Sequence, residues 1–278
     1  MPGLGSPPDG EPPSDFDWEM FNGPAPERPY NPLRGIYNFR WFWDTSGGQM
    51  TNLGQHSQDL VHWFMDVDAP KSVYSHGGRR YLKDICDTPD TQDVIFEYPG
   101  FQVVVQYREA TAGKGGVGMG GLVFYGTRGL MTVGRNGYEV IPDPKIHPIN
   151  TFADIIGGHP VGGPQPVEEE KGQKWTEGVK DDTGDAKADY VSHIRNFLDC
   201  VKSRQDPAVN AEAGHRVATS CHLANISLRT GRKAVWDSEK EEIVGDPAAS
   251  KMLVRRYRAP WDSELDRKST RLNSSHRL

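Results

Sequence analysis

The sequence predicts an α+β fold built on a mainly antiparallel β-sheet, and three observations support this. First, six short segments between residues 71 and 143 are rich in β-branched and aromatic residues, and Gly or Pro turns separate several of them. Second, some of their connections, such as "PG", "TRG" and "NG", are very short, which favours antiparallel neighbours over βαβ units. Third, helical periodicity occurs on both sides of this block, within residues 47–65 and 189–231.

The strands are expected to form a meander. They are predicted at residues 71–78, 92–99, 101–110, 121–127, 129–135 and 137–143. A long exposed excursion is expected at residues 144–186, because this stretch combines Gly- and Pro-rich sequence with many charges.

Helices are predicted before and after the meander. The first, at residues 47–65, is expected to turn one apolar face inward: Met50, Leu53, Ser57, Leu60, Val61 and Phe64. A second stripe on the same helix is mostly polar: Asn52, His56, Asp59 and Trp63. Two closing helices are predicted at residues 189–204 and 210–231, the last with Asn210 suited to its N-cap and Gly231 to its end.

The composition excludes several classes of protein. The 278 residues carry a net charge of −6, and no basic stripe suited to nucleic acid is visible. No apolar run approaches the roughly 18 residues of a membrane span, and the N-terminus has no apolar signal-peptide core. Three widely spaced cysteines form neither a disulfide framework nor a C-x-x-C metal site. We expect a soluble cytoplasmic protein without nucleic-acid or membrane partners, although a lost N-terminus would remove any export signal.

The glycine cluster at residues 112–121 contains G-x-G-x-x-G twice, but its context argues against a dinucleotide site. Such a site needs a helix after the glycines to hold the pyrophosphate, and here further strand sequence follows. The sequence also has no P-loop, no G-x-S-x-G elbow and no H-E-x-x-H, so we expect neither a nucleotide-phosphate loop, nor a serine hydrolase, nor a metal site.

His56 is the leading candidate for chemistry. A solitary helical histidine is usually structural, but three features favour a site at this one. Gly47 and Gly48 at the helix start would let backbone amides approach a ligand, and Asn52 precedes His56 by one turn, so both side chains can face the same place. The segment "NFRWFWD", residues 38–44, adds aromatic and charged groups suited to a sugar-like ligand.

This region resembles a known family. The pattern G-G-x-[ML]-x-[DN]-x-G-x-H-x-x-D is similar to the helix that opens the C-terminal domain of the Gfo/Idh/MocA oxidoreductases. Its matching positions here are Gly47, Gly48, Met50, Asn52, Gly54, His56 and Asp59. The resemblance continues through the meander and the closing helices, over roughly residues 15–262. It implies an open, mainly antiparallel sheet with helices packed on one face.

The resemblance also implies a second domain, an N-terminal Rossmann domain that binds NAD or NADP. Its Gly-rich fingerprint and its E-K-P segment have no counterpart here, so we interpret the chain as truncated, without a cofactor-binding residue of its own. The implied organisation is a leader or interdomain segment at 1–35, a substrate-binding and oligomerisation domain at 36–262, and a non-native or disordered tail at 263–278.

The family's roles carry over to the matching positions. His56 is implied as the acid/base that takes a proton from a sugar or polyol hydroxyl. Asn52 stands where the family often has Asp, and it can position the substrate but cannot take a proton. Gln55, Trp43 and Asp59 are further substrate-binding candidates, Asp59 also having a structural explanation. His159, on the loop "GGHPVGGP", is the last candidate.

The expected function is therefore that of the substrate-binding and catalytic-histidine domain of an NAD(P)-dependent sugar or polyol oxidoreductase, inactive as the isolated chain. The open sheet face implies a homo-oligomer. Two alternatives stay open: an NAD-assisted glycosidase of the same family, and a non-enzymatic module for carbohydrate binding or assembly.

Overall fold

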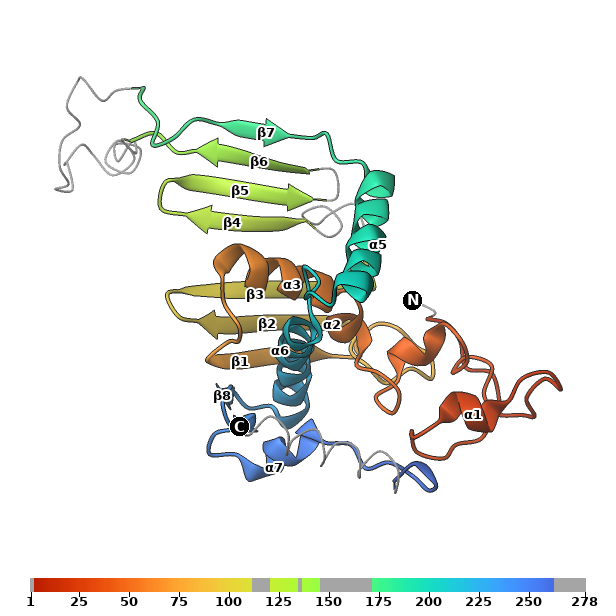
Figure 1. Cartoon of the computed structure of the whole chain (residues 1–278). Helices are drawn as coiled ribbons and strands as arrows, with labels where there is room; N and C mark the ends of the chain where they lie inside the picture. Colours follow the sequence, from red (N-terminus) through yellow and green to blue (C-terminus); the bar gives the residue numbers. More distant parts are fainter. Residues whose placement is uncertain (1–2, 112–120, 135–136, 146–171, 263–278) are drawn as a thin grey trace. The chain divides into compact units, whose positions relative to one another are not determined.

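The computed structural model divides the chain into two units (Figure 1). Unit 1 comprises residues 1–112 and 209–278, and unit 2 comprises residues 113–208. Within them the structure describes residues 3–111, 121–134, 137–145 and 172–262. The glycine cluster up to residue 120, His159 and the expected tail at 263–278 lie outside the described residues. The domain boundaries at residues 35 and 262 stay predictions.

Unit 1 contains one five-stranded sheet with the strand order β3-β2-β1-β8-β9, and every neighbouring pair is antiparallel. Its strands are β1 (Ser72–Gly78), β2 (Thr91–Tyr98), β3 (Phe101–Arg108), β8 (Ala234–Asp237) and β9 (Glu242–Ile243). Its helices are α1 (Trp18–Asn22), η1 (Asn38–Trp41), α2 (Gly48–Asn52), α3 (Gly54–Met65), α6 (Ala211–Thr230), α7 (Pro247–Ser250) and η3 (Lys251–Leu253).

Unit 2 contains a four-stranded antiparallel sheet of order β4-β5-β6-β7 and one long helix. These elements are β4 (Leu122–Gly126), β5 (Gly129–Gly134), β6 (Gly137–Pro142), β7 (Val179–Asp181) and α5 (Ala186–Ser203). Strand β7 falls inside the stretch expected to be an excursion. Its three residues are too few to show alternation, and they become a strand through pairing with β6.

The predicted α+β class and the antiparallel open sheets are confirmed. All six predicted strands occur within one residue of their expected bounds, except that β3 ends two residues early. Both closing helices are present, and Asn210 caps α6 by accepting a hydrogen bond from the Ala213 N–H. Gly231 ends that helix with a left-handed φ of 66°.

Helices α3 and α6 cover one face of β1–β3 (Figure 1), and the core of unit 1 lies between them. Alternation along β2 shows this: Val94, Phe96 and Tyr98 are buried, whereas Ile95 and Glu97 are exposed. From α6 the same core receives Val217, Cys221, Leu223 and Ala224. Among the described residues of unit 1, no helix lies on the opposite face of β1–β3 (Figure 1).

The helix predicted at 47–65 is divided at Leu53 into α2 and α3, and its expected inward face is partly wrong. Leu53 and Phe64 are each 46% exposed. The turn tightens at this joint, where the His56 N–H donates to the Leu53 carbonyl, three residues back. The buried face instead includes the polar residues Gln58 and His62. The Tyr98 hydroxyl hydrogen bonds to both, at Oε1 of Gln58 and Nε2 of His62, while the Gln58 amide nitrogen has no hydrogen-bond partner among the described residues.

A substitution of Gly48 would show how tightly the start of α2 is packed. Its φ is +69°, and a Cβ built there would lie 2.9 Å from the Thr88 Cβ. We expect Gly48→Ala to lower the free energy of unfolding by at least about 2 kcal/mol, because left-handed strain alone costs roughly 1–2 kcal/mol. The matched control is Gly214→Ala on the exposed side of α6, where no atom lies within 4 Å. That change should raise stability by about 0.5–1 kcal/mol. Urea unfolding of both variants measures these changes, and equal changes in the free energy of unfolding would contradict the packing argument.

Candidate functional site

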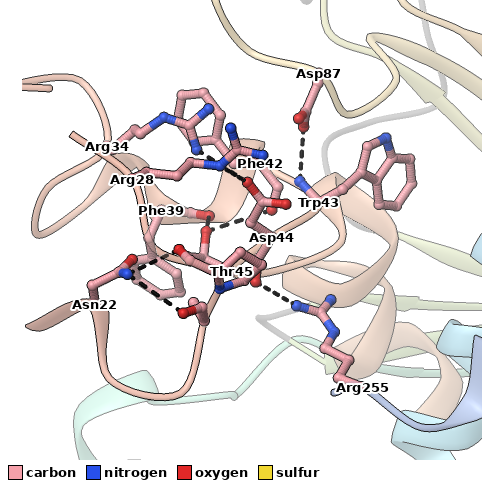
Figure 2. Close-up of polar contacts among 12 residues, drawn as sticks. Asn22, Arg28, Arg34, Phe39, Phe42, Trp43, Asp44, Thr45, Asp87 and Arg255 are labelled. Atoms are coloured by element: carbon pink, nitrogen blue, oxygen red, sulfur yellow. Dashed lines mark hydrogen bonds and ion pairs between the residues drawn. The ribbon is translucent and has the colours of Figure 1, made fainter. Parts of the chain in front are cut away.

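The segment that leads into α2 is fixed by ionic and polar contacts centred on Asp44 (Figure 2). The carboxylate of Asp44 pairs with Arg28 and, at 3.6 Å, with Arg34. From the C-terminal part of the chain, Arg255 donates to the backbone carbonyls of Asp44, at 2.7 Å, and Ser46, at 3.0 Å. Residues more than 200 positions apart in sequence therefore hold this segment in one conformation.

Trp43 takes part in the same arrangement. Its backbone N–H donates to the Asp87 carboxylate at 2.7 Å, and burial raises the pKa of Asp87 (Figure 2). The indole ring lies 5.1 Å from the guanidinium of Arg229 on α6. Trp43 was predicted to bind substrate, and the structure gives its ring a cation–π partner. That role stays a prediction.

The two glycines at the start of α2 have a packing explanation. A Cβ on Gly47 would lie 2.5 Å from the amide nitrogen of Asn225, and one on Gly48 would meet Thr88. The same amide nitrogen donates to the Gly47 carbonyl at 2.8 Å. Glycine is therefore needed so that α2 can approach α6 and the loop before β2 closely. This close approach sets the position of the residues on α2.

Asn52, at the end of α2, is held on both sides of its amide. Its Oδ1 accepts from Nε of Arg40 at 3.1 Å, and its Nδ2 donates to Oε1 of Gln49 at 3.3 Å. Burial raises the pKa of the Glu109 carboxyl, and the side chain of Gln49 opposes this. The hydrogen bonds form a connected row, Arg40–Asn52–Gln49, which we call the amide relay, and Glu109 interacts with its Gln49 end.

His56 follows Asn52 by four residues and is exposed, so its imidazole is open to a ligand. Leu53 between them keeps right-handed helical dihedrals, which leaves the two residues about one turn apart on the same side. Gln55 and Asp59 are half-buried on the same helix. Asp59 also raises the pKa of His62, against the larger effect of burial. It therefore acts electrostatically on the core as well as lying on the polar stripe.

A second histidine on α3 belongs to the core. His62 is buried, and its Nε2 lies 2.9 Å from the Tyr98 hydroxyl, which donates its own proton to Oε1 of Gln58 at 3.1 Å. The imidazole must then be the donor at Nε2, and burial lowers its pKa, which keeps it neutral. His62 therefore has a structural role, whereas His56 on the same helix is exposed, and its role in catalysis stays a prediction.

Sequence reasoning missed three members of the site: Arg40, Gln49 and Glu109. Arg40 was present in the segment "NFRWFWD" but was not singled out. Glu109 could have been found by continuing the alternation of β3, since Phe101, Val103, Val105 and Tyr107 are its less exposed positions. Gln49 gives no pattern of its own, because its partners become known only in three dimensions.

Within the described ranges, no group of three or more His, Cys, Asp or Glu side chains is arranged to hold a metal ion. Nor is any of the helices in these ranges long and apolar enough to cross a membrane.

A family model described as an oxidoreductase family, C-terminal alpha/beta domain, matches residues 7–88 and 181–263, which is more than half of the chain. A comparison with curated proteins gives no match. Solved structures that resemble the chain include the WlbA dehydrogenase from Bordetella pertussis in complex with NADH and UDP-GlcNAcA. It is 18% identical, with a TM-score of 0.47, over 71% of this chain and 51% of that one.

Two other solved structures are similar to a comparable degree. GenD2 from gentamicin A biosynthesis, in complex with NAD, is 18% identical with a TM-score of 0.43, over 73% of this chain and 52% of that one. An oxidoreductase from Agrobacterium radiobacter, in complex with NAD+, L-tartaric acid and magnesium, is 14% identical with a TM-score of 0.43, over 66% and 47%. The chain thus spans about half the length of these structures.

Glu109 gives the site a pH signature. Its pKa in the folded state is raised above the ordinary value of 4.5, so over the interval between the two values the folded state binds more protons than the unfolded state. Stability contributed by this group is therefore present at low pH and lost as pH rises through that interval, by at most about 1.4 kcal/mol per pH unit. We expect Glu109→Gln to raise the free energy of unfolding at pH 7.

The gain should shrink as the pH falls below 4.5, where Glu109 is protonated in both states. Denaturant unfolding across this pH range measures it, with Glu177→Gln as the control for loss of an exposed carboxylate. A Glu109→Gln effect that does not vary with pH would contradict the assignment.

Proposed function

Since the chain belongs to the Gfo/Idh/MocA oxidoreductase family, we propose that it supplies the substrate side of an NAD(P)-dependent oxidation of a sugar or polyol, with His56 as the acid/base. One observation carries this most directly. His56 is exposed one turn after Asn52, whose amide is held by Arg40 and Gln49. A base next to a fixed hydrogen-bonding group is what the removal of a hydroxyl proton requires.

The roles divide by chemistry. The neutral imidazole of His56 accepts the proton of the substrate hydroxyl, and in the reverse direction the imidazolium returns it. Asn52 is a positioning residue, because an amide donates and accepts hydrogen bonds but cannot take up a proton at neutral pH. Trp63, 77% exposed and on the same stripe seven residues after His56, offers an aromatic surface against which a sugar ring can stack.

The described residues do not fit a dinucleotide. Every strand pair between them is antiparallel, so this part of the chain has no parallel βαβ unit whose helix N-terminus could hold a pyrophosphate. The strand β4 follows the glycine cluster, as the sequence predicted. We therefore assign only the proton-transfer side of the reaction to this chain, and we place NAD(P) binding and hydride transfer outside the described residues.

The open face of the five-stranded sheet is the proposed contact with a second copy of the chain. Tyr74, Ile95 and Val104 lie directly opposite one another across β1, β2 and β3. They are 45%, 44% and 58% exposed, respectively. An apolar row of this kind on a face without helices favours burial in an assembly. Ion pairs border it on two sides: Arg108–Asp93 and Lys233–Glu97.

Binding at His56 is the direct test of the proposed function. In the isotope-labelled chain, we expect sugars and polyols to shift the imidazole signals of His56, identified by their loss in His56→Gln, and the shift to weaken in Asn52→Ala. His76 is an internal control, because it lies exposed on the helix-free face of the sheet and should not respond. If no member of a broad panel of sugars and polyols shifts His56, the proposal fails.

The same samples should be titrated with NADH and followed by its fluorescence. We expect no saturable binding at millimolar concentration. Saturable binding would mean that this chain holds the dinucleotide, contrary to the division of roles proposed above.

The sheet contact is tested by Ile95→Lys. A lysine in the centre of the apolar row would have to lose water on assembly, so we expect the wild-type oligomer to become a monomer while the thermal unfolding midpoint of the monomeric unit is kept. Tyr81→Lys, at an exposed position in the loop between β1 and β2, is the matched control. Analytical ultracentrifugation distinguishes the two, and an oligomer that survives Ile95→Lys would place the contact elsewhere.

A further inference from the structure

Arg40 is a cation that the fold holds in place without a carboxylate partner among the described residues. Its Nε donates to Asn52 Oδ1 at 3.1 Å and its Nη1 donates to the Tyr37 carbonyl at 2.6 Å. The rings of Tyr37 and Phe39 lie 4.3 Å and 4.9 Å from the guanidinium carbon. Fixing an arginine side chain costs up to about 2 kcal/mol of rotamer freedom, and here neutral groups supply the contacts that offset this cost.

The neighbouring arginines on the same segment are different. Arg28 and Arg34 both pair with Asp44, so each has a carboxylate partner within the protein. A guanidinium has five N–H donors, and the two hydrogen bonds of Arg40 leave three of them for another partner. Those three are the second N–H of Nη1 and both N–H groups of Nη2, and they can donate charge-assisted hydrogen bonds to the oxygens of a carboxylate.

Asn52 explains why the charge of Arg40 remains available. An aspartate at this position would accept from the same Nε and would neutralise the guanidinium, whereas the asparagine amide orients it without changing its charge. The carboxyl of Glu109 does not take over this role. It interacts with Gln49, and the arginine that acts electrostatically on it is Arg79. The end of the relay next to His56 therefore carries a net positive charge.

We propose that Arg40 binds a carboxylate of the substrate, and that the substrate class is accordingly a sugar acid rather than a neutral sugar. This rests on the proposed function, because it places the acid group beside Asn52 while His56 faces a hydroxyl. Arg40 is the specificity-determining residue, and Asn52 orients it without pairing its charge with a carboxylate. A single guanidinium matches the single charge of a carboxylate better than a phosphate dianion, which would call for a further cation.

The experiment measures the affinity of the chain for D-glucuronate, D-glucose and D-glucose 6-phosphate by calorimetry, with the His56 imidazole signals followed in parallel. The variants are Asn52→Asp, Arg40→Gln and a control, Arg195→Gln, which removes an exposed arginine from α5. We expect glucuronate to bind best. Asn52→Asp and Arg40→Gln should each lower the preference for glucuronate over D-glucose about tenfold, the size of one lost charged hydrogen bond. The control should leave the affinity for both sugars unchanged.

Asn52→Asp is the sharpest variant because it keeps Arg40 and the shape of the side chain and changes only the charge. Circular dichroism melting confirms that each variant is folded. Equal affinity for glucuronate in the wild type and in Asn52→Asp and Arg40→Gln would overturn the role of Arg40, as would absence of glucuronate binding. Tighter binding of the phosphorylated sugar would overturn the choice of carboxylate.

These outcomes are separable from failure of the proposed function. If sugars shift His56 but the preference for glucuronate over D-glucose is the same in the wild type, Asn52→Asp and Arg40→Gln, the acid/base proposal holds and the inference about Arg40 is wrong. If glucuronate binding depends on Arg40 but leaves the His56 signals unmoved, the carboxylate site is real and the role of His56 is wrong.

Discussion

The hydrogen bonds of Asn225 are the constraint on which the site depends. This buried side chain on α6 donates to the Gly47 carbonyl at 2.8 Å and accepts from Nε2 of Gln92 on β2 at 3.3 Å. It therefore joins three elements: the closing helix, the central strand of the meander and the first turn of α2. Because an unpaired buried amide costs about 1–3 kcal/mol, the three elements are held in one register. The position of Asn52 on α2 follows from that register.

Contacts between distant parts of the chain also fix the segment that leads into α2. Asp44, Asp87 and Arg255 come from three different parts of the chain, and together they fix the backbone of the segment that contains Arg40. Individually, exposed ion pairs contribute little to stability. Their value here is geometric, since they determine where the guanidinium of Arg40 stands relative to α2. A site built from a loop and a helix needs such support, because neither element could hold the other at hydrogen-bond distance by itself.

Local pattern was enough to predict much of the fold. Strands β1 to β6 alternate or are β-branched, and α6 has both of its capping residues in the sequence, so each could be located before any tertiary contact was known. Strand β7 and the division of the first helix at Leu53 could not. The first depends on pairing with β6, and the second on a tightened turn and on burial of Gln58 and His62 against Tyr98.

The residues of the candidate site also fall into those that the sequence could predict and those that it could not. His56 and Asn52 stand one helical turn apart in the sequence, which made them visible, whereas Arg40 and Glu109 come from different elements and meet the helix only after folding.

The sequence also presented Asn52 mainly as the absence of a proton acceptor. In three dimensions its neutrality has a positive consequence, because it separates three tasks that a carboxylate would merge. In the proposed site, the charge of Arg40 is left for the ligand, Asn52 sets the direction of the guanidinium, and His56 alone handles the proton. An aspartate in this position would compete with the ligand for the guanidinium and with His56 for the proton. The amide at this one position would therefore allow the proposed anionic substrate group and a neutral base to share a site.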